Sequence, residues 1–210
     1  AEEQTAAFEL SLPADYSPER DYPLLVWFSG GRGNHSTGAA NHLVDRDQFI
    51  VATFPYPGGR LPRLAVRDGG IEEFEAFYAP MFAKLREEFP NLSDSVRIAA
   101  GSSSGGHLLG SALDLDWEDF TGFFTAYVLH EGGYSPNMTF SGLPEGVPVL
   151  ILYGGESKAL KWQRSFMERF RTAATNATFR EIPGAGHGLG AEGRAAIRSW
   201  IETELPGLIQ

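Results

Sequence analysis

The feature that most constrains the fold of this chain is one stretch, from Val96 to Leu109. It begins with an apolar, β-branched run, continues through Gly101-Ser102-Ser103-Ser104-Gly105-Gly106, and ends in an apolar pattern with helical spacing. This order predicts a strand, a sharp turn and a helix. The residues from Gly101 to Gly105 match G-x-S-x-G, in which small flanking residues let the backbone turn tightly and hold the central serine above a sheet. Ser103 is therefore the candidate nucleophile.

A short glycine-rich pattern also arises by chance, and this chain contains 25 glycines. Such a motif is a hypothesis until its surroundings agree with it. A strand before the serine and a helix after it are the surroundings that the chemistry requires, and both are predicted here. The context therefore favours a nucleophilic Ser103 over a structural loop.

Strands and helices alternate along the rest of the chain. The runs 24–28 and 49–54 are apolar on both faces, which is typical of a sheet covered by helices on each side. The helix predicted over 71–89 carries an aromatic stripe, which we interpret as core because its spacing makes one buried face. The other expected strands are 5–12, 22–28, the run from Val96, the second half of 120–129, 148–153 and 178–182; the other expected helices are a short one ending over 41–47, the one after Ser103, 158–172 and 191–205.

This alternation predicts an α/β sandwich with a mainly parallel sheet and helices on both faces. Ligands of such sheets bind at the carboxyl ends of the strands. The rule selects the following loops for a functional site: 29–34, 101–106, 130–134 with 154–157, and 184–188.

Composition predicts one globular domain over residues 1–210. No apolar run approaches the roughly 20 residues that a membrane-spanning helix needs. A net charge of −10 argues against a nucleic-acid partner, because a binding face would need clustered Lys and Arg. Cysteine is absent, which excludes disulfides and a cysteine nucleophile. The start Ala1-Glu2-Glu3-Gln4 fits a removed signal peptide or a trimmed end, and with the acidic charge it predicts a secreted or periplasmic protein.

A serine hydroxyl needs a base within hydrogen-bond reach and a third group that orients that base. His187 is the best base of the five histidines, because it stands in a glycine-rich loop, 183–188, between the last expected strand and the last expected helix. The backbone of such a loop can carry an imidazole back over the sheet. We assign no chemistry to the other histidines, which are His35, His42, His107 and His130.

Four parts of the chain resemble the α/β-hydrolase superfamily, and in particular small secreted esterases related to polyhydroxybutyrate depolymerases and feruloyl esterases. They are Leu12-Pro13-Ala14-Asp15-Tyr16 with 22–31, then 101–106, 148–154 and 183–188. The resemblance implies a triad in the order serine, acid, histidine, and Ser103 and His187 obey this order. It also implies an oxyanion hole made by the backbone N–H groups of Ser104 and Gly31.

Two residues depart from the family pattern in the loop that carries Gly31. Ser29 stands where the family usually has a histidine. Arg32 adds a cation, which either contacts a substrate carboxylate or faces water; the sequence leaves both readings open.

The orienting acid is the largest departure. The family places an aspartate at the fourth position of the loop that starts at Gly154, and Ser157 stands there. We rank Glu156 first as the acid, and Glu131, at the end of the preceding strand, second. A dyad without an acid is the third possibility. The ranking predicts that Glu156→Gln lowers turnover far more than Glu131→Gln.

The combined features predict a metal-independent, cofactor-free carboxylesterase that acts through an acyl-enzyme. Its partner would be an ester substrate. The chain is short for this fold and has no insertion long enough for a substantial lid, so an open site and a bulky ester, such as an acyl-decorated polysaccharide, are expected. Alternatives are a peptidase or thioesterase of the same fold, or a non-catalytic binding module that keeps the scaffold.

Overall fold

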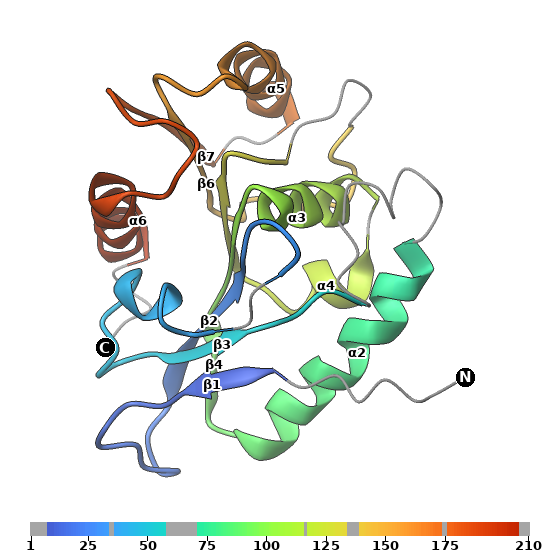
Figure 1. Cartoon of the computed structure of the whole chain (residues 1–210). Helices are drawn as coiled ribbons and strands as arrows, with labels where there is room; N and C mark the ends of the chain where they lie inside the picture. Colours follow the sequence, from blue (N-terminus) through green and yellow to red (C-terminus); the bar gives the residue numbers. More distant parts are fainter. Residues whose placement is uncertain are drawn as a thin grey trace.

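One sheet of seven strands forms the centre of the protein (Figure 1). The structure is a computed structural model that describes residues 8–33, 36–57, 71–115, 117–133, 139–173 and 176–205. The strand order is β1-β3-β2-β4-β5-β6-β7. β1 is antiparallel to β3, and every other neighbouring pair is parallel. The strands are β1 (Glu9–Ser11), β2 (Tyr22–Phe28), β3 (Ile50–Thr53), β4 (Leu92–Ser102), β5 (Ala126–His130), β6 (Val149–Gly154) and β7 (Ala177–Ile182).

Helices cover both faces of this sheet (Figure 1). The apolar side chains of the two faces form two separate core clusters. One face is covered by α2 (Ile71–Glu88), α3 (Ser104–Asp114), α4 (Glu118–Thr121) and α5 (Leu160–Ala173); the other is covered by the 3₁₀ helix η1 (Ala40–His42) and α6 (Ala191–Glu204). The predicted α/β sandwich with a mainly parallel sheet is confirmed.

Strand β2 shows why a run that is apolar on both faces forms a central strand. All seven of its residues are buried. Leu24 and Val26 lie in one core cluster, whereas Leu25 and Trp27 lie in the other, because successive side chains of a strand point to opposite faces. The aromatic stripe of α2 packs on the first of these faces and is core, as the spacing predicts.

A few boundaries differ from the expected ones. β4 begins at Leu92 rather than Val96, because Leu92 already pairs with Tyr22 of β2. The short helix expected to end over 41–47 is limited to η1. No helix is predicted to begin within the acidic stretch 114–119, but α4 begins at Glu118. Between β5 and β6, the described residues 131–133 and 139–148 contain no helix or strand.

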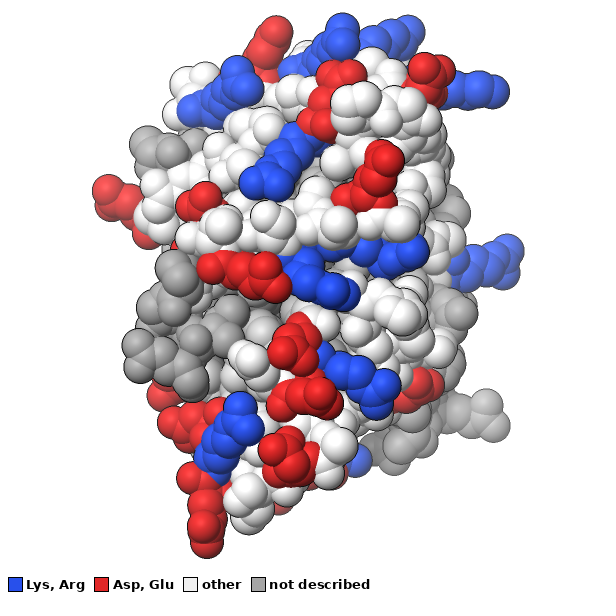
Figure 2. Space-filling view, turned by 90° about the vertical axis from the view of Figure 1, so that its left-hand side faces the viewer, with Lys and Arg blue, Asp and Glu red and all other residues white. Residues whose placement is uncertain are grey.

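Two surface properties follow from the described residues. None of their helices combines the length and the apolar character needed to cross a membrane. On the face shown in Figure 2, the coloured Lys and Arg side chains are interspersed with Asp and Glu side chains.

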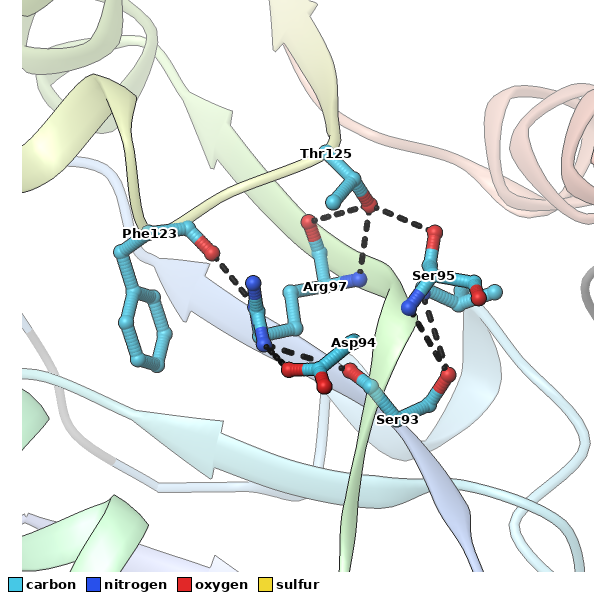
Figure 3. A network of polar contacts seen from close by, with 7 residues as sticks. Ser93, Asp94, Ser95, Arg97, Phe123 and Thr125 are labelled. Carbon is cyan, nitrogen blue, oxygen red and sulfur yellow. Dashed lines mark hydrogen bonds and ion pairs between the residues drawn. The ribbon is translucent and has the colours of Figure 1, made fainter.

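Arg97, in β4, ties the segment just before β5 to that strand (Figure 3). Its Nε donates a hydrogen bond to the Phe123 carbonyl oxygen at 2.6 Å, and its Nη1 donates to Asp94 Oδ1 at 2.8 Å. The backbone N–H of Arg97 donates to Thr125 Oγ1 at 2.9 Å. In return, the backbone N–H of Thr125 donates to the Arg97 carbonyl oxygen at 2.7 Å. These contacts hold the loop before β5 against β4, so the pairing of the two strands begins in register.

Arg97→Ala is expected to lower the free energy of unfolding by about 2 kcal/mol, the typical cost of losing a hydrogen bond from a charged donor to a half-buried acceptor. Asp94→Asn should change it little, because the Asp94 side chain is 98% exposed and its ion pair is screened by water. Urea unfolding monitored by circular dichroism measures both variants. Equal losses for the two variants would show that the surface ion pair, and not the bond to Phe123, is the stabilising contact.

Candidate active site

Ser103 lies in a strained turn between β4 and α3. Its φ is +52°, a left-handed backbone conformation that residues with a side chain rarely adopt. Its backbone N–H donates to the carbonyl oxygen of His130, the last residue of β5, at 2.8 Å. The neighbouring strand therefore holds the turn in this conformation.

The flanking glycines of the motif are required by close packing. A Cβ on Gly105 would lie 1.9 Å from the carbonyl oxygen of Phe28 at the end of β2. A Cβ on Gly101 would lie 2.5 Å from the carbonyl carbon of Gly105. Real Cβ atoms do not approach other atoms so closely, so α3 can begin directly against β2 and β4 because these positions lack side chains.

Gly105→Ala is therefore expected to destabilise the protein by about 3 kcal/mol, at the upper end of the usual cost of overpacking. Gly186→Ala is the matched control, because a Cβ at Gly186 meets no atom within 4 Å. Thermal unfolding of both variants measures the difference. If Gly105→Ala unfolds at the wild-type temperature, the close approach of α3 to β2 is not required for the fold.

The structure brings Ser103, His187 and Glu131 into one hydrogen-bonded chain. His187 Nε2 lies 2.9 Å from Ser103 Oγ, and His187 Nδ1 lies 3.1 Å from Glu131 Oε2. The serine follows β4, the glutamate follows β5, and the histidine lies in the loop between β7 and α6. The His187 side chain is 56% exposed, so the chain of contacts opens to solvent at the imidazole.

Glu131 is fully buried and its carboxylate is well supplied with donors. Oε1 accepts the Gly154 N–H at 2.6 Å, and Oε2 accepts the Ser157 hydroxyl at 2.6 Å. The side chain has an exposed fraction of 0%. Burying a carboxylate is costly unless hydrogen bonds and charges compensate it, and these donors with His187 provide that compensation.

The first-ranked acid, Glu156, does not contact His187. Its backbone N–H donates to the Ala185 carbonyl at 2.9 Å, which ties this loop to the histidine loop, but its side chain is exposed. Among the described residues, no hydrogen bond or ion pair joins the Glu156 carboxylate to the imidazole. The ranking of Glu156 above Glu131 is therefore corrected: the tight turn at 154–157 turns Glu156 outward and Ser157 inward.

The two predicted oxyanion donors lie on either side of the serine. Ser104 is the first residue of α3, where a backbone N–H has no acceptor within the helix. The glycine loop lies against Ser103, since a Cβ on Gly30 would be 3.4 Å from the Ser103 Cβ. Gly31, the next residue, has a φ of +64° and is exposed. Their role in binding an oxyanion stays a prediction.

Tyr56 supports this glycine loop, and sequence reasoning did not single it out. Its hydroxyl donates to the Ser29 carbonyl oxygen, and its ring leaves no room for a Cβ on Gly33. Burial raises the pKa of Tyr56 above its ordinary value, so it stays a neutral donor. Arg32 is exposed, and both readings of this residue stay predictions.

Two of the other histidines, His130 and His107, make hydrogen bonds within the framework of the site. His130 Nδ1 lies 2.8 Å from Ser102 Oγ, and His107 Nδ1 accepts the Gly133 N–H at 3.3 Å. His42 is exposed in η1. His35 lies outside the described residues, as do parts of the loops 29–34 and 130–134.

His130 makes the stability of the protein depend on pH. Burial lowers its pKa from 6.5 to about 4, with a smaller opposing effect of Glu131. Between these values the unfolded chain binds more protons than the folded one, so stability falls as pH falls from 6.5 towards 4, by an amount on the order of 3 kcal/mol.

His130→Asn is expected to flatten this dependence, and His42→Asn should leave it unchanged because His42 is exposed. Urea unfolding at several pH values between 4 and 6.5 measures it. A slope in His130→Asn equal to that of the wild type would assign the pH dependence to other groups.

The described residues contain no group of three or more His, Cys, Asp or Glu side chains that could hold a metal ion. A cavity of about 260 Å³ lies beside the histidine loop, and Gly154, Ile182, Ala185 and Gly188 are among its lining residues. Its lining does not include Ser103, so this cavity is not the place where a substrate would meet the serine.

This chain is similar to known proteins in its structure and not in its overall sequence. No protein-family model matches the sequence, and no curated protein matches it. Esterase 2 of Thermogutta terrifontis, phosphonylated by sarin, has a TM-score of 0.69 at 16% identity; the alignment covers 100% of this chain and 94% of that one. The feruloyl esterase FAE has a TM-score of 0.66 at 16% identity; the alignment covers 98% of this chain and 83% of that one.

A thermostable esterase has a TM-score of 0.59 at 19% identity, with 85% of this chain covered. This chain spans about half of that protein, 51% of its length. Identities this low establish the fold and not the activity. The sheet order, the serine turn between β4 and α3, and these similarities agree with the resemblance expected from the sequence. The chain therefore has the α/β-hydrolase fold, which it shares with these esterases.

Proposed function

We propose that this protein is a serine carboxylesterase that works through an acyl-enzyme. The observation that supports this proposal is the chain of contacts from Ser103 Oγ through the His187 imidazole to Glu131. A serine, a base and an orienting carboxylate in this arrangement are what nucleophilic catalysis at an acyl group requires.

In the first half-reaction, Ser103 Oγ attacks the ester carbonyl carbon while His187 Nε2 takes the hydroxyl proton. Glu131 accepts the hydrogen bond from His187 Nδ1, which fixes the tautomer and stabilises the imidazolium that forms. The oxyanion is stabilised by the N–H groups of Ser104 and Gly31. The C–O bond to the alcohol then breaks, and His187 returns the proton to the leaving oxygen.

In the second half-reaction, a water molecule attacks the carbonyl carbon of the acyl-enzyme, and His187 removes a proton from that water. The bond between the acyl carbon and Ser103 Oγ breaks, His187 returns the proton to Ser103 Oγ, and a carboxylic acid leaves. Each bond formed is matched by one broken, and no redox partner is needed.

For the substrate, we propose an ester whose alcohol part is bulky, such as an acyl-decorated polysaccharide. The exposure of His187 and the lack of helix or strand in the described residues between β5 and β6 support an open site. The esterase 2 of T. terrifontis was solved with propionate bound, so a short acyl group is the first to test here.

A site without an orienting acid would favour the non-catalytic binding module, and Ser157 stands where the family has its aspartate. The buried carboxylate of Glu131 contacts His187 instead, so the missing aspartate does not favour this alternative.

The test is covalent labelling with a fluorophosphonate, followed by intact mass and peptide mapping. We expect one adduct on Ser103, because its oxygen displaces fluoride from phosphorus in the folded protein. Ser102→Ala should still be labelled, and urea-unfolded protein should not. An unmodified folded protein, or an adduct on another residue, would contradict the proposal.

A further inference from the structure

Ser157 lies against the same carboxylate oxygen as His187. Its hydroxyl donates to Glu131 Oε2 at 2.6 Å, and His187 Nδ1 lies 3.1 Å from that oxygen. Ser157 is 7% exposed, and its backbone N–H closes a turn on the Gly154 carbonyl at 3.0 Å. Gly154, at the other end of this turn, donates its N–H to Glu131 Oε1. One turn after β6 therefore holds both oxygens of the carboxylate.

These two hydrogen bonds fix the rotation of the Glu131 carboxylate. The bond from Gly154 holds one oxygen, Oε1. The Ser157 hydroxyl fixes the second oxygen on the side where His187 Nδ1 lies. Orientation of this oxygen matters because the acid acts by holding the imidazole in one tautomer and one position.

We infer that Ser157 is a positioning residue for Glu131: its hydroxyl holds Oε2 in the orientation in which this oxygen faces His187 Nδ1. This inference rests on the proposed function.

The first test is Ser157→Ala against Ser157→Thr. We expect kcat to fall about tenfold in Ser157→Ala with KM unchanged, which is the effect of losing a hydrogen bond to a charged group in the transition state. Ser157→Thr keeps the hydroxyl and should retain most of kcat. Unchanged kcat and pH profile in Ser157→Ala would overturn the positioning role.

The second test is independent of turnover. The proton on His187 Nδ1 gives a low-field NMR signal when a carboxylate accepts it, so we expect this signal in the wild type and in Ser157→Thr, and its displacement to higher field in Ser157→Ala. An identical signal in folded Ser157→Ala would overturn the positioning role.

The outcome is separable from that of the proposed function. A wild type that reacts with the fluorophosphonate at Ser103, combined with a Ser157→Ala variant whose kcat and NMR signal are unchanged, rejects the positioning role alone. A wild type that is neither labelled nor active rejects the proposed function.

Discussion

Ser103→Ala is expected to lower kcat for p-nitrophenyl acetate by about 10⁶-fold, the scale on which loss of the nucleophile acts in serine hydrolases. Alanine removes Oγ, so no acyl-enzyme forms and His187 has no hydroxyl proton to accept. The residual rate would come from water attack on substrate held by the remaining site. Because the variant loses one oxygen at a half-buried position, its stability should stay close to that of the wild type.

Ser104→Ala is the matched control for this variant. Ser104 would contribute through its backbone N–H, which alanine retains, so kcat should stay within a small factor of the wild type. Initial rates, with circular dichroism to confirm folding, measure both variants. A folded Ser103→Ala protein with wild-type turnover would exclude the serine mechanism.

Glu131→Gln is expected to lower kcat by about 10⁴-fold, the loss seen when a triad acid becomes an amide. The amide fits the same space, but its NH₂ group can face His187 and favour the wrong tautomer. Glu156→Gln should leave kcat nearly unchanged, because the Glu156 side chain is exposed and does not contact the imidazole. This order is the reverse of the one that loop counting predicts.

The pair is measured side by side, with kcat and KM determined at several pH values. Glu131→Gln should change kcat with little change in KM, since the Glu131 side chain is buried and would act through His187. Should Glu156→Gln be the more damaging substitution, the contact between His187 and Glu131 would not be the catalytic one.

Most of the fold was predictable because its signals are local. β2 and β3 are continuous apolar runs, and the turn at Ser103 is marked by glycines that the packing requires. His187 could be selected for the same reason, since it follows the last strand in a glycine-rich loop. Such features depend on a few consecutive residues and on rules for parallel sheets.

The acid was not predictable in the same way, because it depends on how two loops face each other. Ser157 and Glu131 are 26 residues apart, and their contact is set by the pairing of β5 with β6. A signal was present nonetheless. The residue after His130 follows a strand that lies beside β4, so its side chain emerges next to the serine turn. Counting positions along the loop that starts at Gly154 does not consider the end of β5 as a source of the acid.

The separation of the three polar residues along the chain determines when during folding the site forms. His187 is 84 residues from Ser103 and 56 residues from Glu131. Contacts so distant in sequence form late, after the local helices and turns, because closing long loops costs chain entropy. The serine turn needs β5 in place, and the imidazole needs β7 and the loop after it. Recovery of the proposed esterase activity after dilution from denaturant would therefore report completion of the native topology, and it would lag behind the recovery of helical structure.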